Sequence, residues 1–106
     1  MEPEDTLVDF LYGNYVEKLP LKIKKWSRCW IYFTDKKLIC LTDMFGGSIT
    51  IPYENIKQLE KCSQGLFPMG IAITYESPEN GELTEDRFSM SGRQKWLDFL
   101  SEKAGV

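Results

Sequence analysis

Basic side chains are concentrated in one short part of the sequence, where they could bind an anionic group. Between residues 18 and 37 the chain has seven lysines and arginines but only one acidic residue, so this window carries a net charge of +6. Because the whole chain carries −3, the other residues carry −9. Ammonium and guanidinium groups gathered on one surface attract phosphates and carboxylates. The basic residues of the window are Lys18, Lys22, Lys24, Lys25, Arg28, Lys36 and Lys37.

A second candidate binding element is the apolar loop SQGLFPMG, residues 63 to 70. Leu66, Phe67 and Met69 stand there between glycines and a proline, which favour a loop. Exposed at a loop tip, these side chains would bind a partner or a bilayer. The alternative is that they tuck beneath one end of the fold, which is the more common use of such residues.

The remaining reactive side chains give little support to catalysis or metal binding. The chain has no histidine for a catalytic triad, and it has no G-x-S-x-G, phosphate-loop or dinucleotide-binding pattern. Cys29, Cys40 and Cys62 are odd in number and lack C-x-x-C spacing, which indicates reduced thiols and not a disulfide framework or zinc site. We therefore expect no enzyme activity, no metal and no cofactor.

The length and composition are those of one globular domain. A chain of 106 residues with 42% hydrophobic residues can bury a core of its own, so we expect a single domain over residues 1–106. No apolar run approaches the roughly 18 residues of a membrane span, and the acidic N-terminus is unlike a signal peptide. We therefore expect a cytoplasmic protein.

Short runs of β-branched and aromatic residues, most of them followed by a turn signal, predict a mainly β fold. Asn80 and Gly81 form the strongest hairpin signal, and Gly46 and Gly47 permit another turn. Pro52 cannot donate a ladder hydrogen bond, so its strand ends there or lies at a sheet edge. The predicted strands are 12–23, 28–34, 38–42, 48–53, 70–76 and 83–90.

Two further segments have a less distinct pattern. Residues 55–62 fit either a strand or a helical turn, and the periodicity alone does not decide between them. A short helical turn is expected at 5–11, before the first strand. With 55–62 counted as a strand, the chain has about seven strands.

The C-terminal residues change to the period of a helix. Ser91 and Gln94 match the capping box, in which each side chain bonds a free amide of the first turn. Gly105 offers a C-terminal stop. The apolar residues of this helix, expected to cover an open end or edge of the sheet, are Trp96, Leu97, Phe99, Leu100 and Ala104.

In this order of elements the sequence resembles the pleckstrin-homology superfamily, including its GRAM branch. KKWSRCWIYFTDKKLICL, residues 24–41, is similar to the hairpin of the second and third strands in this family. SITIPYENIKQLEK, residues 48–61, is similar to the GRAM pattern that follows such a hairpin. SGRQKWLDFL, residues 91–100, resembles the family's C-terminal helix with its tryptophan. The resemblance covers residues 13–104.

The resemblance implies a mainly β architecture. It is a seven-stranded, partly open barrel of two orthogonal antiparallel sheets, capped by the C-terminal helix. Members of this family are chiefly binding modules, and many of them bind phosphoinositide headgroups or protein partners.

The resemblance also implies where a lipid would bind. Lipid-binding members use basic residues late in the first strand, in the first loop and early in the second strand. Ser27 and Cys29 occupy two positions that are basic in headgroup-binding members, and strand alternation sends Arg28 to the opposite face. By position, the lipid- or anion-binding residues here are Lys18, Lys22, Lys24, Lys25 and Arg28.

We therefore expect a recognition module that binds an anionic membrane surface weakly, through phosphoinositide or phosphatidylserine headgroups, or binds an acidic protein partner. Such a protein would be cytoplasmic and peripherally associated with membranes. The alternative is a protein-interaction or assembly domain without a lipid role.

Nucleic acid is not an expected partner. Trp26, Arg28, Trp30 and Tyr32 share one parity and could stack on bases beside a cation. However, the isoelectric point is near 5.0, and an acidic cluster would repel a polyanion. These carboxylates surround the hairpin predicted at Asn80, where we expect them to be solvated: Glu76, Glu79, Glu82, Glu85 and Asp86.

Overall fold

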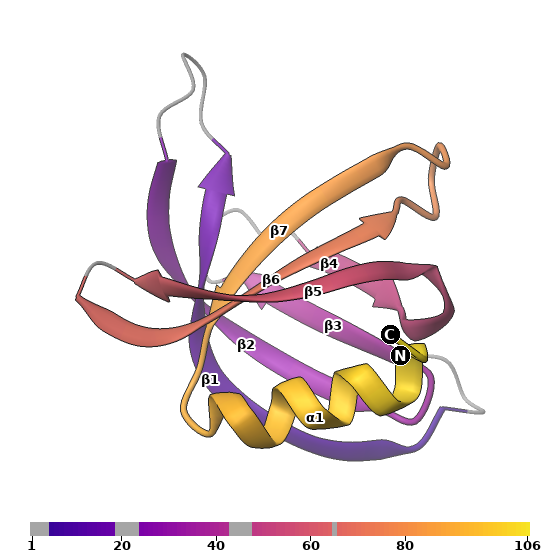
Figure 1. Ribbon diagram of the computed structural model, residues 1–106, viewed down its shortest axis with the longest axis horizontal. Coiled ribbons are helices and arrows are strands. Elements are labelled where there is room, and N and C mark those ends of the chain that lie inside the picture. The colour runs from indigo at the N-terminus through magenta and orange to yellow at the C-terminus, as the bar shows by residue number, and fades with distance from the viewer. Residues whose placement is uncertain (1–4, 19–23, 43–47, 65) are drawn as a thin grey trace.

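The structure is a computed structural model that describes residues 5–18, 24–42, 48–64 and 66–106, with the backbone alone at residues 17, 18, 24, 25 and 64. Within these ranges no helix is long and apolar enough to cross a membrane. The elements, shown in Figure 1, are β1 (Leu7–Lys18), β2 (Lys24–Thr34), β3 (Lys37–Thr42), β4 (Ser48–Pro52), the 3-10 helix η2 (Tyr53–Asn55), β5 (Ile56–Gln64), β6 (Phe67–Glu76), β7 (Leu83–Ser89) and α1 (Arg93–Ala104).

The seven strands form one antiparallel sheet in the order β4-β3-β2-β1-β7-β6-β5. β1 joins the two halves of this sheet, because it pairs with β2 along its length and with β7 at Asn14 and Tyr15. In Figure 1 the half formed by β5, β6 and β7 lies across the half formed by β1–β4. The strands at the two ends of the order, β4 and β5, do not pair with each other in the described structure, so the barrel is partly open. The predicted fold class is confirmed.

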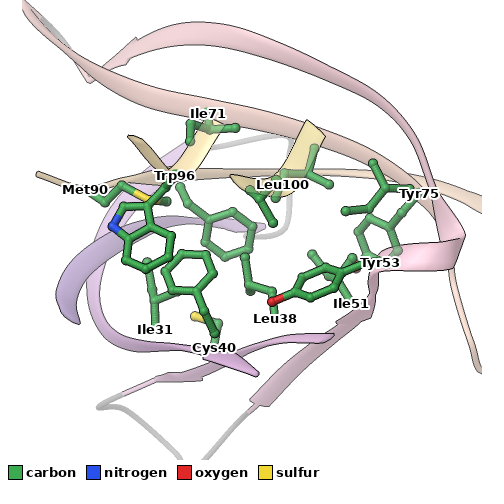
Figure 2. Packing of buried hydrophobic residues seen from close by; sticks show 14 of the residues in the cluster. Ile31, Leu38, Cys40, Ile51, Tyr53, Ile71, Tyr75, Met90, Trp96 and Leu100 are labelled. Atoms are coloured by element: carbon green, nitrogen blue, oxygen red, sulfur yellow. The ribbon is translucent and has the colours of Figure 1, made fainter. Parts of the chain in front are cut away.

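Side chains of β2 alternate between the interior and the surface of the barrel. Cys29, Ile31 and Phe33 are fully buried, whereas Trp30 between them keeps 39% of its surface exposed. Because successive residues of a strand point to opposite faces, one face of β2 supplies the core. The core is completed by Leu38, Cys40, Ile51, Tyr53, Ile56, Ile71, Ile73, Tyr75, Phe88, Met90, Trp96 and Leu100, most of which are labelled in Figure 2.

α1 is attached to the barrel by aromatic packing. The rings of Trp96 and Phe33 stack with their centroids 3.9 Å apart. Phe99 meets Phe33 and Tyr53 edge-on, in both cases at 5.8 Å. In Figure 2, Trp96 and Leu100 point from the helix toward the side chains of the strands. The helix therefore packs against the barrel and contributes to the same core.

Two local predictions are wrong. Residues 5–11 do not form a helical turn, because from residue 7 onward they belong to β1 and pair with β2. The predicted capping box of Ser91 and Gln94 is also absent from α1. Gly92 is the N-cap, with a φ of 72° and no capping side chain, and Gln94 donates a hydrogen bond to Asp98 instead.

The structure confirms or refines several other predicted strands and turns. Residues 55–62 form mostly strand, since β5 begins at Ile56. β2 and β6 begin earlier than predicted, at residues 24 and 67. Gly81 has the positive φ expected of the predicted hairpin, Gly105 ends α1, and Pro52 ends the edge strand β4. The predicted turn at Gly46 and Gly47 lies outside the described residues.

We predict that Trp96→Ala lowers the free energy of unfolding by about 3–5 kcal/mol, because it removes a large ring that is stacked on Phe33 and 4% exposed. Urea denaturation followed by circular dichroism measures this loss. Glu102→Ala, on the exposed side of the same helix, is the control and should change the value by less than about 0.5 kcal/mol. A loss below about 1 kcal/mol for Trp96→Ala would contradict the packing described.

Candidate anion-binding site

The β1–β2 hairpin brings three of the predicted lysines, Lys18, Lys24 and Lys25, to one end of the barrel. The register pairs Lys18 with Lys24 and Glu17 with Lys25. Directly opposed residues of antiparallel strands have Cα atoms about 4.5–5.5 Å apart, so three lysines and one glutamate share the last two pairs of this ladder. Lys22 lies outside the described residues. The backbone therefore brings Lys18, Lys24 and Lys25 close together, and their role in binding an anion stays a prediction.

Arg28 lies four residues along β2 from Lys24, on the outer surface of the barrel. It is exposed, and its guanidinium carbon lies 5.7 Å from the centre of the Tyr12 ring. This cation–π contact holds the charge over the outer face. The neighbouring Cys29 is fully buried on the other side of the strand. Alternation thus separates Arg28 from the interior of the barrel, as predicted.

The inner face of β2 offers no cation among its described side chains. Ser27 is half-buried and pairs with Tyr15, and Cys29 is inside the core. The pKa of the Cys40 thiol is raised, mainly by a hydrogen bond with Cys29 and to a smaller extent by burial. A neutral thiol neither binds an anion nor acts as a nucleophile. The described part of this inner face therefore has no basic side chain for an anionic headgroup.

The outer face of β1, β2 and β3 carries a cluster that we call the aromatic face. Phe10 stacks on Tyr32 at 5.8 Å and lies 6.0 Å from Trp30, and Tyr12 meets Trp30 edge-on at 4.7 Å. The sequence pattern indicated Trp30 and Tyr32 but not the other members. Phe10 fell in the wrongly predicted helical turn, and the meeting of Tyr12, Ile39 and Leu41 with these rings follows from strand register. The members are Phe10, Tyr12, Trp30, Tyr32, Ile39 and Leu41.

The apolar loop lies at the end of the β5–β6 hairpin. Leu66 is 98% exposed and Phe67 is 65% exposed, while Met69 is half-buried. The alternative that these side chains tuck beneath the barrel is therefore wrong for Leu66 and Phe67. Two large apolar side chains are available at this tip for a partner.

The acidic cluster around the β6–β7 hairpin is only partly solvated. Glu76, Glu79, Glu82 and Glu85 are exposed as predicted, but Asp86 is 8% exposed, which corrects that prediction. Tyr75 donates a hydrogen bond of 2.6 Å to the Asp86 carboxylate. Burial raises the pKa of the Tyr75 hydroxyl, and this hydrogen bond and the charge of Asp86 raise it further. Within the described ranges no group of three histidine, cysteine or acidic residues could hold a metal ion.

We predict that this buried pair makes the protein less stable in alkali. The folded-state pKa of Tyr75 lies above the unfolded value of about 10, so its contribution is complete below about pH 10 and is lost as the pH rises toward the folded-state pKa. Tyr75→Phe should therefore reduce the fall in unfolding free energy above pH 10 by about 1 kcal/mol. Denaturation at a series of alkaline pH values measures this effect, with Tyr32→Phe as the control. Parallel curves for wild type and Tyr75→Phe would contradict it.

Comparison with known proteins defines the class of fold. No family model matches the sequence, and no curated protein matches it. Among solved structures, the C-terminal domain of an unknown protein from Leishmania infantum matches with a TM-score of 0.69 and 16% identity, over 96% of this chain and 86% of that one. The Slm1-PH domain in complex with inositol-4-phosphate matches with a TM-score of 0.67 and 11% identity, over 93% of this chain and 96% of that one.

Other matches agree with this class. The complex of human RhoA with the DH/PH fragment of PDZRHOGEF contains a chain that matches with a TM-score of 0.68 and 9% identity, over 95% of this chain but only 29% of that one. The Slm1-PH domain has also been solved with phosphoserine. The chain thus has the pleckstrin-homology fold, as the sequence resemblance predicted. These matches do not separate the GRAM branch, which stays a prediction.

Proposed function

We propose that this protein is a non-enzymatic recognition module, a single domain over residues 1–106, that binds anionic membrane lipid headgroups weakly through the β1–β2 hairpin. The observation that carries the proposal is the register of β1 and β2, which sets Lys18 opposite Lys24 and adds Lys25 beside them. Lys22 lies between these residues in the sequence. Arg28 adds an exposed charge on the same strand.

The expected affinity is low and depends on salt. Each lysine or arginine near an anionic leaflet contributes about 1 kcal/mol, so four of them alone correspond to a dissociation constant of about 1 mM. Among the described side chains of β2, the burial of Cys29 and the outward position of Arg28 leave the inner face without a charged group to select one headgroup. Phosphatidylserine and phosphoinositides would therefore bind in proportion to their charge. The partner is a cytoplasmic membrane surface, and no nucleic acid is expected.

We predict that vesicles containing phosphatidylserine or phosphoinositides sediment the protein at low salt and release it by about 0.3 M salt, where screening is short-ranged. Lys24→Glu with Lys25→Glu should weaken sedimentation at least about tenfold, because it replaces attraction by repulsion. Lys36→Glu with Lys103→Glu is a matched control. It makes the same change of net charge at exposed positions away from the hairpin, and it should have a much smaller effect.

Two results would argue against binding through the hairpin. If anionic vesicles fail to sediment the wild-type protein even at low salt, the membrane role is wrong. Equal losses in the two double variants would show that binding follows net charge and not the hairpin.

A second candidate function is protein interaction or assembly through the β5–β6 tip. The observation that favours it is the exposure of Leu66, at 98%, and of Phe67, at 65%. Apolar side chains this exposed at a hairpin tip gain stability when a partner covers them. Met69, half-buried beside them, would support the contact. An acidic partner surface could engage the lysine hairpin at the same time.

For this function we predict concentration-dependent self-association in size-exclusion chromatography with light scattering, insensitive to Lys24→Glu with Lys25→Glu. Leu66→Ser with Phe67→Ser should abolish it. Leu83→Ser, at a residue that is 67% exposed on β7, is the control and should leave it unchanged. A monomer at all concentrations, identical in every variant, would argue against assembly through this tip.

A further inference from the structure

We propose that the aromatic face of β1, β2 and β3 is a second membrane-contact surface, which lies in the headgroup region of an anionic bilayer once the lysine hairpin has brought the domain there. This inference rests on the proposed membrane role of the hairpin. It adds a surface that neither the basic window nor the fold indicates, and it gives the bound domain a defined orientation.

The strand register arranges the aromatic face in two rows. In one row Phe10 lies opposite Tyr32, which lies opposite Ile39. In the other, Tyr12 lies opposite Trp30, which lies opposite Leu41. Ring centroids 4.7–6.0 Å apart show that the four aromatic side chains form one continuous surface.

This surface is open to solvent in the described part of the chain. Phe10 is 52% exposed, Leu41 is 42% exposed, and Tyr12 and Trp30 are each 39% exposed. On the opposite sides of β2 and β3, Ile31, Leu38 and Cys40 are fully buried in the core. A contiguous patch of large apolar side chains is unfavourable in water and marks a contact surface.

The charges on the outer face fit an anionic bilayer. We consider the described outward side chains of β1–β4 in the rows of the sheet from Phe10 to Val16. Arg28, beside Tyr12, is the charged residue among them, and none of them is a carboxylate. Bringing this face to lipid phosphates therefore desolvates no negative charge. The outward residues that share the face with its six members are Asn14, Val16, Trp26, Arg28, Ser48 and Thr50.

The aromatic face is also continuous with the lysine hairpin. β1 and β2 carry the rings, and the same two strands run on to the Lys18–Lys24 pair. Tryptophan and tyrosine favour the membrane interface, where the ring is in an apolar environment and its polar group remains hydrated. Long-range attraction by lysines followed by shallow burial of rings thus uses the same two strands. This continuity favours a bilayer over a second copy of the chain or a peptide.

Trp30 provides a direct test. In a Trp26→Phe background the remaining tryptophans are Trp30 and Trp96, and Trp96 is 4% exposed in the core. On binding phosphatidylcholine vesicles that contain phosphatidylserine and brominated acyl chains, the Trp30 emission should shift to the blue and be quenched. Trp26→Phe with Trp30→Phe is the blank, which retains only Trp96 and should show no quenching.

A partition experiment gives an independent measurement. Tyr12→Ser with Leu41→Ser should lower partition into these vesicles about tenfold. Leu83→Ser with Val106→Ser, which removes two exposed apolar side chains elsewhere, should change it less than about twofold. Circular dichroism checks that each variant is folded. If the first variant is unfolded, the quenching of Trp30 in the Trp26→Phe protein decides.

The outcomes separate this inference from the proposed function. Vesicle binding with an unquenched Trp30 would overturn the inference and leave the hairpin function standing. No vesicle binding at low salt would overturn both. Shielding of Trp30 with rising protein concentration in the absence of vesicles would show that a second copy covers the face, which also overturns the inference.

Discussion

The alternation of side chains along β2 is the constraint on which the rest of this structure depends. Every second residue from Cys29 to Phe33 is fully buried, and the residues between them face outward. The inner set meets α1 through the stacked rings of Phe33 and Trp96. The outer set includes the rings that pair with β1. A shift of one residue in register would exchange the core with the surface, so folding and surface chemistry are specified together.

This constraint also underlies the weak, unselective binding that we propose. In β2, Arg28 is exposed on the outer side, and the next residue, Cys29, is buried in the core. The charge therefore lies on the outer surface, in contact with Tyr12. A domain arranged in this way is suited to a broad, weak, oriented association with an anionic surface. It is less suited to enclosing one small ligand.

Much of the fold could be predicted because its signals are local. Strand alternation, the Asn80-Gly81 turn and the helical spacing around Trp96 each require only a few neighbouring residues. Residues 5–11 were misjudged because their apolar residues also fit a helical turn, and only pairing with β2 decides for a strand. The capping box failed because Gly92 can adopt the φ of 72° that starts α1 directly.

The candidate site was less predictable, because it depends on register between strands. The lysines were visible as a run, but the meeting of Phe10 and Tyr12 with Trp30 follows from the pairing of β1 with β2. The burial of Asp86 likewise follows from the pairing of β6 with β7, which sets it opposite Ile73. Such contacts join residues far apart in the chain, where single-sequence patterns have no signal.

We propose that the outer side of the β1–β2 hairpin faces the membrane. The most direct measurement is nuclear magnetic resonance of the protein on anionic bicelles that contain a lipid with a spin-labelled headgroup. In this orientation we expect strong paramagnetic broadening of the Trp30 indole and of the Lys24 and Lys25 amides, with the buried Trp96 indole preserved. Broadening confined to the β5–β6 tip at Leu66 and Phe67, with the Trp30 indole unchanged, would contradict it.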